Sequence, residues 1–362
     1  MKNKNTFVTE PSLAPLDEYT KILEGVWERK ILTHNGPLVQ RFENELSSKI
    51  NTNNFVAVSN GTIAIQMAIK ALNLKGQIIT PAFTWVATIS AIKWEGCEPV
   101  FCDIDPQTLN IDTEKIEECI TKETVAILPV HVFGNPCEVD KIQDLANKYN
   151  LKIIYDAAHA IGSKYNDKSV LDYGDISATS LHATKLLNTG EGGGCITSDD
   201  HLYESLKRIR FFGHNEKKDI VEDGFNGKMT EVHAALGLAN LKYFDQVLSD
   251  RKNKYNFYLE NLIDLISLRF QKFNKDHINY SYFPIIFKSE KQLLKVLDEL
   301  AQHNIFARRY FYPSANTFRN IIKYVPCEVS ESISRRIICL PLFKELSFEK
   351  INQIIHIVKN CL

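Results

Sequence analysis

The first 250 residues of the chain alternate short apolar runs with longer amphipathic stretches, and this alternation restricts the fold more than any other feature. The apolar runs have the length and composition of buried strands: Asn54–Val58, Gln77–Thr80, Pro99–Asp103, Val125–Val130 and Lys152–Asp156. Helical spacing fills the intervals at Gly61–Leu72, Thr84–Trp94, Thr113–Ile120 and Val139–Tyr149. The sequence therefore predicts an α/β fold with a mostly parallel sheet that is covered on both faces.

The pattern changes near residue 240. Two consecutive helical stretches, Met229–Phe244 and Asp250–Leu262, precede a strand-like Asn279–Phe287 and two further helices, Lys291–His303 and Phe348–Cys361. This order is typical of an α+β unit. We therefore predict a large α/β domain at residues 1–245 and a smaller α+β domain at residues 246–362, and we allow for the N-terminal segment to pack on the smaller domain.

The charge balance argues against a nucleic-acid-binding protein. The 362 residues contain 43 Lys and Arg and 44 Asp and Glu, so the net charge is −1 and there is no basic excess. An anionic ligand must therefore be held by a few local donors.

No apolar run reaches the roughly 18 residues of a membrane span, and the start of the chain lacks the apolar core of a signal peptide. Eight cysteines without a CxxC pair predict reduced thiols and a cytoplasmic protein, with no metal site.

In open α/β sheets, ligands bind at the carboxyl ends of the strands, so the residues that follow each predicted strand are candidates for a site. Ser59-Asn60-Gly61-Thr62 follows the first strand and opens a helix, a pattern typical of a phosphate cradle or simply of helix capping by Ser59 or Thr62. Trp85 follows the second strand and could stack on a flat ring or lie in the core.

Three ionisable residues follow two later strands. Asp156 ends a buried strand, where a carboxylate needs a cationic or hydrogen-bonding partner, and His159 lies three residues on. Lys185 lies between an apolar strand that ends near Ser180 and a triple glycine, a place where burial makes an amine nucleophilic. A phosphate cradle, a flat aromatic, a buried carboxylate and a buried lysine at one sheet edge are the four parts of a pyridoxal phosphate site.

Several motifs, in this order, resemble those of the DegT-type sugar-nucleotide aminotransferases, which have the aspartate-aminotransferase fold (fold type I). They run nearly end to end and include SNGTIAIQMAIKAL, PAFTWVATISAI, ILPVHVFGNPCEVDKI, IIYDAAHAIGS, SLHATKLLNTGEGGG and FNGKMTEVHAALGLANL. Two positions depart from the usual pattern: Lys228 stands where many relatives carry Arg, and Thr179 and Leu181 flank Ser180 where Phe is common.

The resemblance implies a role for each matching residue. Lys185 binds the cofactor and transfers protons, Asp156 pairs with the pyridine nitrogen, and Trp85 stacks on the ring, beside which His159 lies. The phosphate contacts are Gly61, Thr62 and Ser180. Asn226, within FNGKM, reaches the phosphate of a neighbouring subunit, which implies a homodimer with shared active sites.

The motif details resemble the viosamine-type branch of the family. That branch aminates dTDP-4-keto-6-deoxy-D-glucose with L-glutamate as donor, through pyridoxamine phosphate, and yields dTDP-4-amino-4,6-dideoxy-D-glucose for an O-antigen or another glycan. The alternatives are a 3-keto or a UDP- or GDP-linked sugar aminotransferase and, further away, a non-catalytic sensor with the same fold. A sugar 3-dehydratase would carry His in place of Lys185.

Candidate substrate contacts lie in two segments. In ARRYFYP the basic Arg308 and Arg309 and the aromatic Tyr310, Phe311 and Tyr312 could close a nucleotide pocket, or they could be a solvated pair beside core aromatics. In LTHNGP, three residues could lie near the sugar or merely precede a helix that starts at a proline: Thr33, Asn35 and Gly36.

Overall fold

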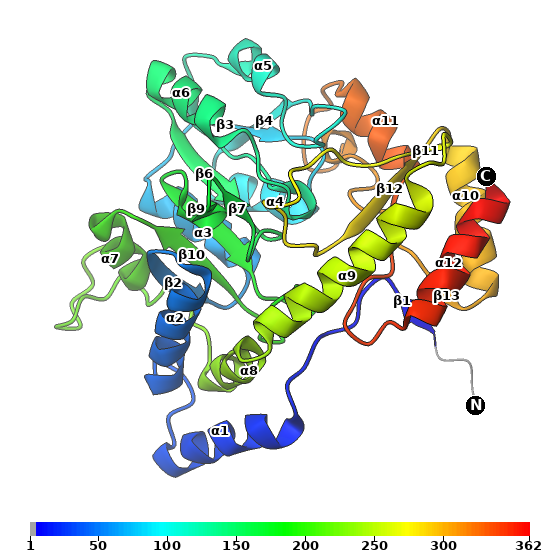
Figure 1. The fold of residues 1–362 in the computed structure, drawn as a ribbon. Helices are drawn as coiled ribbons and strands as arrows, with labels where there is room; N and C mark the ends of the chain where they lie inside the picture. Colours follow the sequence, from blue (N-terminus) through cyan, green and yellow to red (C-terminus); the bar gives the residue numbers. More distant parts are fainter. Residues whose placement is uncertain (1–4) are drawn as a thin grey trace.

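The computed structural model describes residues 5–362. A seven-stranded sheet forms its centre, in the order β2-β10-β9-β6-β5-β3-β4 (Figure 1). Five neighbouring strands are parallel and β10 is antiparallel to both of its neighbours. The fold is therefore α/β with a mostly parallel sheet, as predicted. The strands are β2 (Asn54–Val58), β3 (Gln77–Pro81), β4 (Glu98–Cys102), β5 (Thr124–Ile127), β6 (Lys152–Asp156), β9 (Ile176–Ser180) and β10 (Gly193–Thr197).

Alternate side chains of each strand enter two different cores, because successive residues of a strand point to opposite faces. In β6, Ile153 and Tyr155 pack with α2 (Pro37–Ile50), α6 (Val139–Tyr149) and α8 (Glu231–Leu241). Ile154 packs on the other face with α3 (Gly61–Ala71), α4 (Val86–Trp94) and α7 (Asp200–Ile209). Both faces of the sheet are thus covered by helices. A further helix, α1 (Leu16–Arg29), lies along α8 at the edge of the molecule.

The smaller unit is built on an antiparallel three-stranded sheet, β11-β12-β14, covered by helices α10 and α12 (Figure 1). The N-terminal β1 pairs in parallel with β13 of this unit, so the N-terminal segment packs on the smaller unit. Its elements are β1 (Thr6–Phe7), β11 (Leu268–Arg269), β12 (Phe283–Phe287), α10 (Glu290–Gln302), β13 (Ile305–Phe306), α11 (Glu328–Arg336), β14 (Ile337–Leu340) and α12 (Phe348–Cys361).

One long helix, α9 (Phe244–Leu262), joins the two units, and the predicted division at 245/246 falls inside it. Its first turns carry Phe244 and Val247 into the core of the large unit. Its later turns carry Tyr255 and Tyr258 into the core of the small unit. The chain therefore passes between the cores along a continuous helix rather than through a loop.

Some predicted boundaries shift. The predicted helix at residues 113–120 is a short α5 (Thr113–Ile116) followed by a 3-10 turn, η1 (Glu117–Cys119). The helix predicted from Met229 begins at Glu231, because the Thr230 side chain accepts the N–H of His233 as an N-cap. The remaining elements are η2 (Val132–Gly134), β7 (Lys164–Tyr165), β8 (Lys168–Ser169), η3 (Val170–Asp172) and η4 (Ala315–Thr317).

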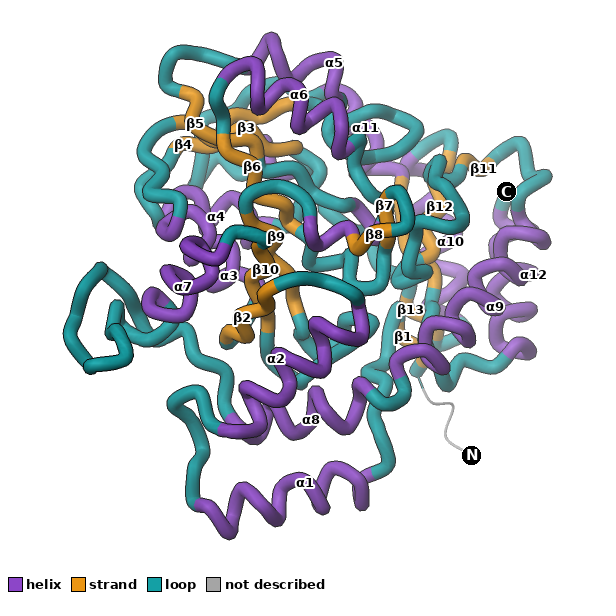
Figure 2. Tube along the Cα trace, turned by 60° about the vertical axis from the view of Figure 1, so that its left-hand side comes forward, coloured by secondary structure: helices purple, strands orange, loops and turns teal. Residues whose placement is uncertain are grey.

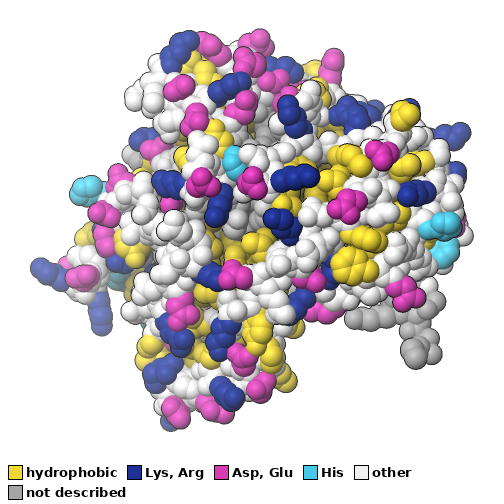
Figure 3. Space-filling model, viewed as in Figure 1, with side chains coloured by type: hydrophobic (Ala, Val, Ile, Leu, Met, Phe, Trp, Pro, Cys, Tyr) yellow, Lys and Arg dark blue, Asp and Glu magenta, His cyan; other side chains and the backbone are white. Residues whose placement is uncertain are grey.

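The surface mixes charges of both signs. Lys and Arg side chains alternate with Asp and Glu side chains over the face in Figure 3, in agreement with the net charge of −1. A loop between α7 and α8 stands out from the body of the molecule (Figures 1 and 2). Within residues 5–362, no helix has both the length and the apolar character that a membrane crossing requires.

Candidate active site

A cavity of about 650 Å³ opens at the carboxyl edge of the parallel strands, where the fold brings most of the predicted residues together. The turns after β2, β3, β6 and β9 form one wall, and the segment after β13 forms the other. The predicted residues in its lining are Ser59, Gly61, Thr62, Trp85, Asp156, His159, Ser180, Lys185, Arg308, Tyr310 and Phe311.

The start of α3 is free to bind an anion. Asn60, rather than Ser59 or Thr62, is the N-cap, and its side-chain oxygen accepts the N–H of Ile63 at 2.9 Å. The first N–H groups of a helix have no partner inside the helix, so those of Gly61 and Thr62 remain for a ligand. A Cβ on Gly61 would lie 3.0 Å from the Cβ of Ser180, so glycine allows α3 to begin close against the end of β9. The start of α3 and the Ser180 hydroxyl together line an anion cradle in the cavity.

Asp156 is a buried carboxylate with two donors. Its Oδ2 accepts the Thr88 hydroxyl at 2.8 Å, and its Oδ1 accepts the Ala158 N–H at 3.1 Å. Burial raises the pKa of Asp156, while Thr88, Ala158 and the charge of Lys185 act in the opposite direction. The carboxyl group is therefore held at the cavity wall by the turn that follows β6 and by helix α4.

Lys185 is a lysine with a lowered pKa. Burial of its amine, with a smaller contribution from the charge of Arg308, lowers the pKa of Lys185 to about 8, although Asp156 opposes the change. Its Nζ lies 3.4 Å from the hydroxyl of Tyr282, a residue of the small unit. An amine of this pKa is partly neutral near pH 8 and can act as a nucleophile or a base.

His159 is neutral and is held among aromatic rings. Burial lowers its pKa well below the usual value, and the charges of Lys185 and Arg308 act in the same direction. The N–H of Phe133 points at Nδ1 of His159 at 3.3 Å, so Nδ1 is the acceptor and Nε2 carries the proton. Its ring centroid lies 4.5 Å from that of Tyr282. His159 therefore presents an uncharged ring beside Lys185.

Trp85 and Arg308 meet at the mouth of the cavity. Trp85 is the N-cap residue of α4, and half of its surface is exposed, so it does not occupy the core position that was the alternative to ring stacking. The guanidinium carbon of Arg308 lies 5.5 Å from the centre of the Trp85 ring and 5.0 Å from that of Tyr310. A cation and two aromatic rings thus border the entrance.

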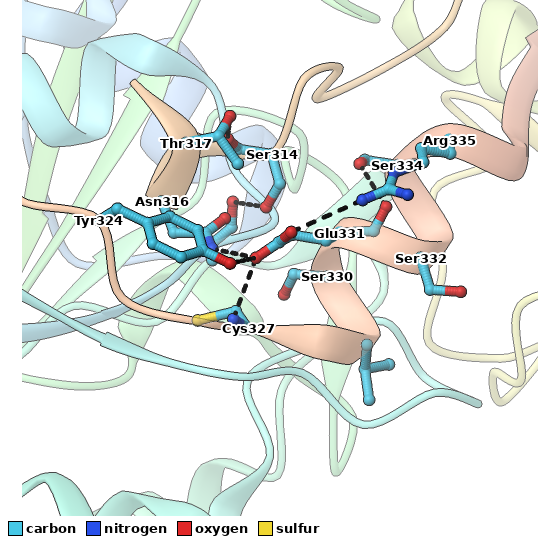
Figure 4. A network of polar contacts seen from close by, with 12 residues as sticks. Ser314, Asn316, Thr317, Tyr324, Cys327, Ser330, Glu331, Ser332, Ser334 and Arg335 are labelled. Atoms are coloured by element: carbon cyan, nitrogen blue, oxygen red, sulfur yellow. Dashed lines mark hydrogen bonds and ion pairs between the residues drawn. The ribbon is translucent and has the colours of Figure 1, made fainter. Parts of the chain in front are cut away.

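The segment that carries Arg308 and Tyr310 is fixed to the sheet. The Ser314 hydroxyl and the Ala315 N–H both donate to the carbonyl of Ala82, at 3.2 and 2.9 Å, three residues before Trp85. Glu331 of α11 holds the following loop by accepting three donors, drawn in Figure 4: the Asn316 amide, the Tyr324 hydroxyl and the Cys327 N–H. The small unit therefore contributes a defined wall to the cavity.

Arg309 and Tyr312 lie outside the cavity, in contrast to the prediction that the whole ARRYFYP segment closes the pocket. Arg309 pairs with Glu290 at 2.6 Å and lies over the ring of Tyr312, which is 45% exposed. Adjacent side chains of an extended segment point to opposite sides, so Arg308 faces the cavity and Arg309 faces away.

Thr33, Asn35 and Gly36 also lie outside this cavity. Gly36 is the N-cap residue of α2, as the helix-start interpretation predicts, and a Cβ there would lie 2.6 Å from the buried carboxyl carbon of Glu231. Asn35 accepts a hydrogen bond from Arg210 at 3.1 Å and borders a separate hollow of about 500 Å³.

Asn226 is exposed and is not among the residues that line the large cavity. It forms an isolated bridge with Phe211 at the base of the projecting loop. Lys228, the departure noted in the sequence, borders the smaller hollow and lies over the rings of Phe211 and Phe212. This loop and the LTHNGP segment thus share one region of the surface, apart from the cavity of the same chain.

Among the cavity residues that sequence reasoning missed are three with hydroxyl groups: Thr84, Thr88 and Tyr282. The two threonines have a sequence signal, since they flank Trp85 and are four residues apart, a spacing that aligns side chains at a helix start. Tyr282 has none, because it comes from the small unit and reaches Lys185 only through tertiary packing.

The cavity residues fit pyridoxal phosphate, the cofactor predicted from the sequence. The two helix N–H groups and the Ser180 hydroxyl match a phosphate, the exposed Trp85 offers a stacking face, and Asp156 and Lys185 offer a carboxylate and an amine.

A family model described as the DegT/DnrJ/EryC1/StrS aminotransferase family matches residues 16–359. The chain belongs to this family. Among the relatives of known function, a dTDP-4-amino-4,6-dideoxy-D-glucose transaminase from Shigella dysenteriae is 42% identical, covering 98% of this chain and 99% of the relative. A transaminase of the same name from Escherichia coli is 36% identical over 96% of both chains. A GDP-perosamine synthase from Escherichia coli O157:H7 is 33% identical over 95% of both chains.

Solved structures of similar proteins agree with the DegT/DnrJ/EryC1/StrS assignment. DesI, crystallised with its TDP-sugar product, superimposes with a TM-score of 0.93 at 28% identity, covering 99% of this chain and 93% of DesI. NtdA from Bacillus subtilis, with its cofactor PMP bound, gives a TM-score of 0.88 at 26% identity, covering 100% of this chain and 86% of NtdA. The resemblance inferred from the motifs and the predicted fold type are confirmed.

Proposed function

We propose that this protein transfers an amino group from L-glutamate to dTDP-4-keto-6-deoxy-D-glucose and forms dTDP-4-amino-4,6-dideoxy-D-glucose, with pyridoxal phosphate as cofactor. The observation that carries the proposal is the meeting of Lys185, with its lowered pKa, and the buried Asp156 in one cavity with the free start of α3. The choice of sugar is supported by the 42% identity to the Shigella dysenteriae transaminase over nearly the whole of both chains.

Five residues would hold the cofactor. The N–H groups of Gly61 and Thr62 and the hydroxyl of Ser180 would bind the phosphate, Trp85 would stack on the ring, and Asp156 would pair with the ring nitrogen. When bound, pyridoxal phosphate carries the amino group between the two substrates and withdraws electrons from the carbon that loses a proton. This phosphate site adds no formal charge, in keeping with a chain of net charge −1.

Lys185 moves the proton. As a neutral amine it removes the α-proton of glutamate, and as an ammonium it returns a proton during the same half-reaction. A base is most effective when its pKa lies near the working pH, and the pKa of about 8 meets this condition. Tyr282 holds the amine in place through its hydroxyl at 3.4 Å. The keto sugar then undergoes the same steps in the opposite direction.

Arg308 is the group that we assign to the anionic substrate. It lines the cavity beside Trp85 and Tyr310, and its charge lowers the pKa of both Lys185 and His159, so it acts directly on the site. A guanidinium in this position can pair with a carboxylate or with a diphosphate. The second arginine of the segment, Arg309, already has a carboxylate partner in Glu290.

We further propose that the active protein is a homodimer with shared sites. Asn226 is exposed outside its own cavity, and the adjacent projecting loop exposes apolar side chains, which favours contact with a second copy. These side chains are Phe212, Ile220 and Val221.

The eight cysteines are free thiols, which supports a reducing compartment such as the cytoplasm.

The competing function is amination of a GDP-linked sugar, favoured by the 33% identity to a GDP-perosamine synthase. The test uses purified protein loaded with pyridoxal phosphate. Glutamate should remove the visible absorption band, and the correct keto sugar should restore it. Comparing dTDP-, UDP- and GDP-4-keto-6-deoxyhexoses with 3-keto isomers, with NMR of the product, identifies the substrate. A protein that takes up no cofactor would refute the proposal, and Lys185→Ala provides the inactive control.

A further inference from the structure

Two threonine hydroxyls form a chain that ends on Asp156. The Thr88 hydroxyl donates to Oδ2 of Asp156 at 2.8 Å, and the Thr84 hydroxyl lies 2.8 Å from that of Thr88. Both threonines are buried, with at most 1% of their surface exposed. They flank Trp85 at the start of α4, so one short segment carries both the stacking ring and the hydroxyl chain.

The direction of the chain follows from counting protons. A threonine hydroxyl has a single proton to donate, and that of Thr88 is used on Asp156. The proton between the two threonines must therefore come from Thr84. Both hydroxyl dipoles point toward the carboxylate, and consecutive hydrogen bonds of the same direction strengthen one another. This arrangement favours the ionised form of the acid over the neutral form.

We propose that Thr88, supported by Thr84, is a positioning residue that keeps Asp156 ionised and oriented toward the ring nitrogen of the cofactor. The inference rests on the proposed function. An isolated buried carboxyl group would become neutral, and a neutral acid could not hold a pyridine nitrogen in its protonated form. The hydroxyl chain opposes this effect of burial.

The other groups around Asp156 do not replace the chain. Within residues 5–362, Lys185 is the one cation among the influences on the pKa of Asp156, and its effect is smaller than those of Thr88 and the Ala158 N–H. The Cys137 thiol on the adjoining turn is neutral, because burial raises its pKa. His159 is neutral because burial lowers its pKa well below the usual value. Thr88 provides the largest of the interactions that favour the carboxylate.

The first test measures the acid itself in protein without cofactor. Carbon-13 NMR of labelled aspartates follows the titration of Asp156, assigned with the Asp156→Asn variant. Thr88→Val replaces the hydroxyl with a methyl group of the same size and should raise the pKa of Asp156 by about one to two units, the effect of one lost hydrogen bond to a charge. Thr88→Ser restores the hydroxyl and should return the pKa to that of the wild type.

The matched control is Thr80→Val. Thr80 is fully buried, and its hydroxyl donates to the carbonyl of Leu128 at 2.9 Å, away from Asp156. This variant should lose similar stability and leave the pKa of Asp156 unchanged. Equal pKa values in Thr88→Val and Thr80→Val would overturn the inference. Should Thr88→Val fail to fold, Thr84→Val takes its place and should raise the pKa of Asp156 by a smaller amount. An unchanged pKa of Asp156 in that variant would overturn the inference.

The second readout is cofactor affinity, measured by absorbance titration. Thr88→Val should bind pyridoxal phosphate about tenfold more weakly at pH 8. The loss should grow as the pH falls, because the variant's carboxyl group is protonated at a higher pH than that of the wild type. A protein that binds no cofactor refutes the proposed function and leaves the NMR test standing. A protein that binds cofactor with an unchanged pKa of Asp156 refutes only the role of Thr88.

Discussion

Replacing Lys185 with methionine should abolish transamination and yet make the cofactor-free protein more stable. The wild-type amine carries a cost, because burial lowers its pKa from 10.5 to about 8. This difference corresponds to about 3 kcal/mol when the amine is charged in both the folded and the unfolded protein. Methionine has a similar length and no charge, so Lys185→Met removes this cost. This value is an upper limit for the gain in the free energy of unfolding, because the substitution also removes the cation beside Asp156.

The sign of the pH dependence follows from the lowered pKa. Below pH 8 the amine is charged in both states, and the full cost of about 3 kcal/mol applies. Between pH 8 and 10.5 the folded protein has lost the proton and the unfolded protein has kept it, so wild-type stability rises with pH. At pH 9.5 the remaining cost is about 1 kcal/mol. The advantage of Lys185→Met should therefore shrink by more than half between pH 7 and pH 9.5.

The assay is denaturant unfolding of both proteins without cofactor, at equal protein concentration and at both pH values. Lys122→Met, a change at an exposed turn lysine away from the projecting loop, is the control and should shift the free energy of unfolding by no more than about 0.5 kcal/mol. A Lys185→Met protein that is less stable than the wild type at pH 7, or whose advantage does not fall with pH, would refute the assignment of a buried charged amine.

Three further changes test the other parts of the site. Gly61→Ala should weaken cofactor binding about tenfold with little change in the melting temperature, because the added methyl group presses against the end of β9 and widens the cradle; normal binding in an absorbance titration would contradict this. Arg308→Gln should raise KM for the nucleotide sugar at least tenfold. Arg309→Gln, which removes the pair with Glu290 and the hydrogen bond to the Arg335 carbonyl, both outside the cavity, should leave KM near the wild-type value. Equal effects of the two arginine changes would contradict the opposite orientations of their side chains. Mixing inactive Lys185→Ala and Asn226→Ala proteins should restore about a quarter of wild-type activity, since half of the dimers are hybrids with one intact site; a mixture that stays inactive under conditions of subunit exchange would argue against shared sites.

The strands and their order along the chain were predictable, because the signal is local. The predicted strands Asn54–Val58 and Lys152–Asp156 and the helix Val139–Tyr149 have the bounds that the structure shows. Each is a compact run with one clear periodicity and a turn or cap at each end. The segment at residues 113–120 was less predictable, since the helical spacing does not distinguish one helix from a short helix followed by a 3-10 turn.

The candidate site was predictable where it consists of residues that follow strands. Asp156 and Lys185 could be placed on one edge because the carboxyl ends of parallel strands meet there. The N-cap residue of α3 was not predictable, because Ser59, Asn60 and Thr62 are all good cap residues. Only the backbone geometry selects Asn60.

The sequence by itself determined the layered fold and the chemical parts of the cavity, because periodicity and turn residues act over a few neighbouring positions. The tertiary structure alone decided how those parts are coupled. It brings Tyr282 from the small unit to Lys185, turns Arg308 toward the cavity and Arg309 away from it, and ends a chain of two threonine hydroxyls on Asp156. These contacts depend on burial and on the packing of distant segments, which lower the pKa of an amine and orient a carboxylate without any mark in the local sequence.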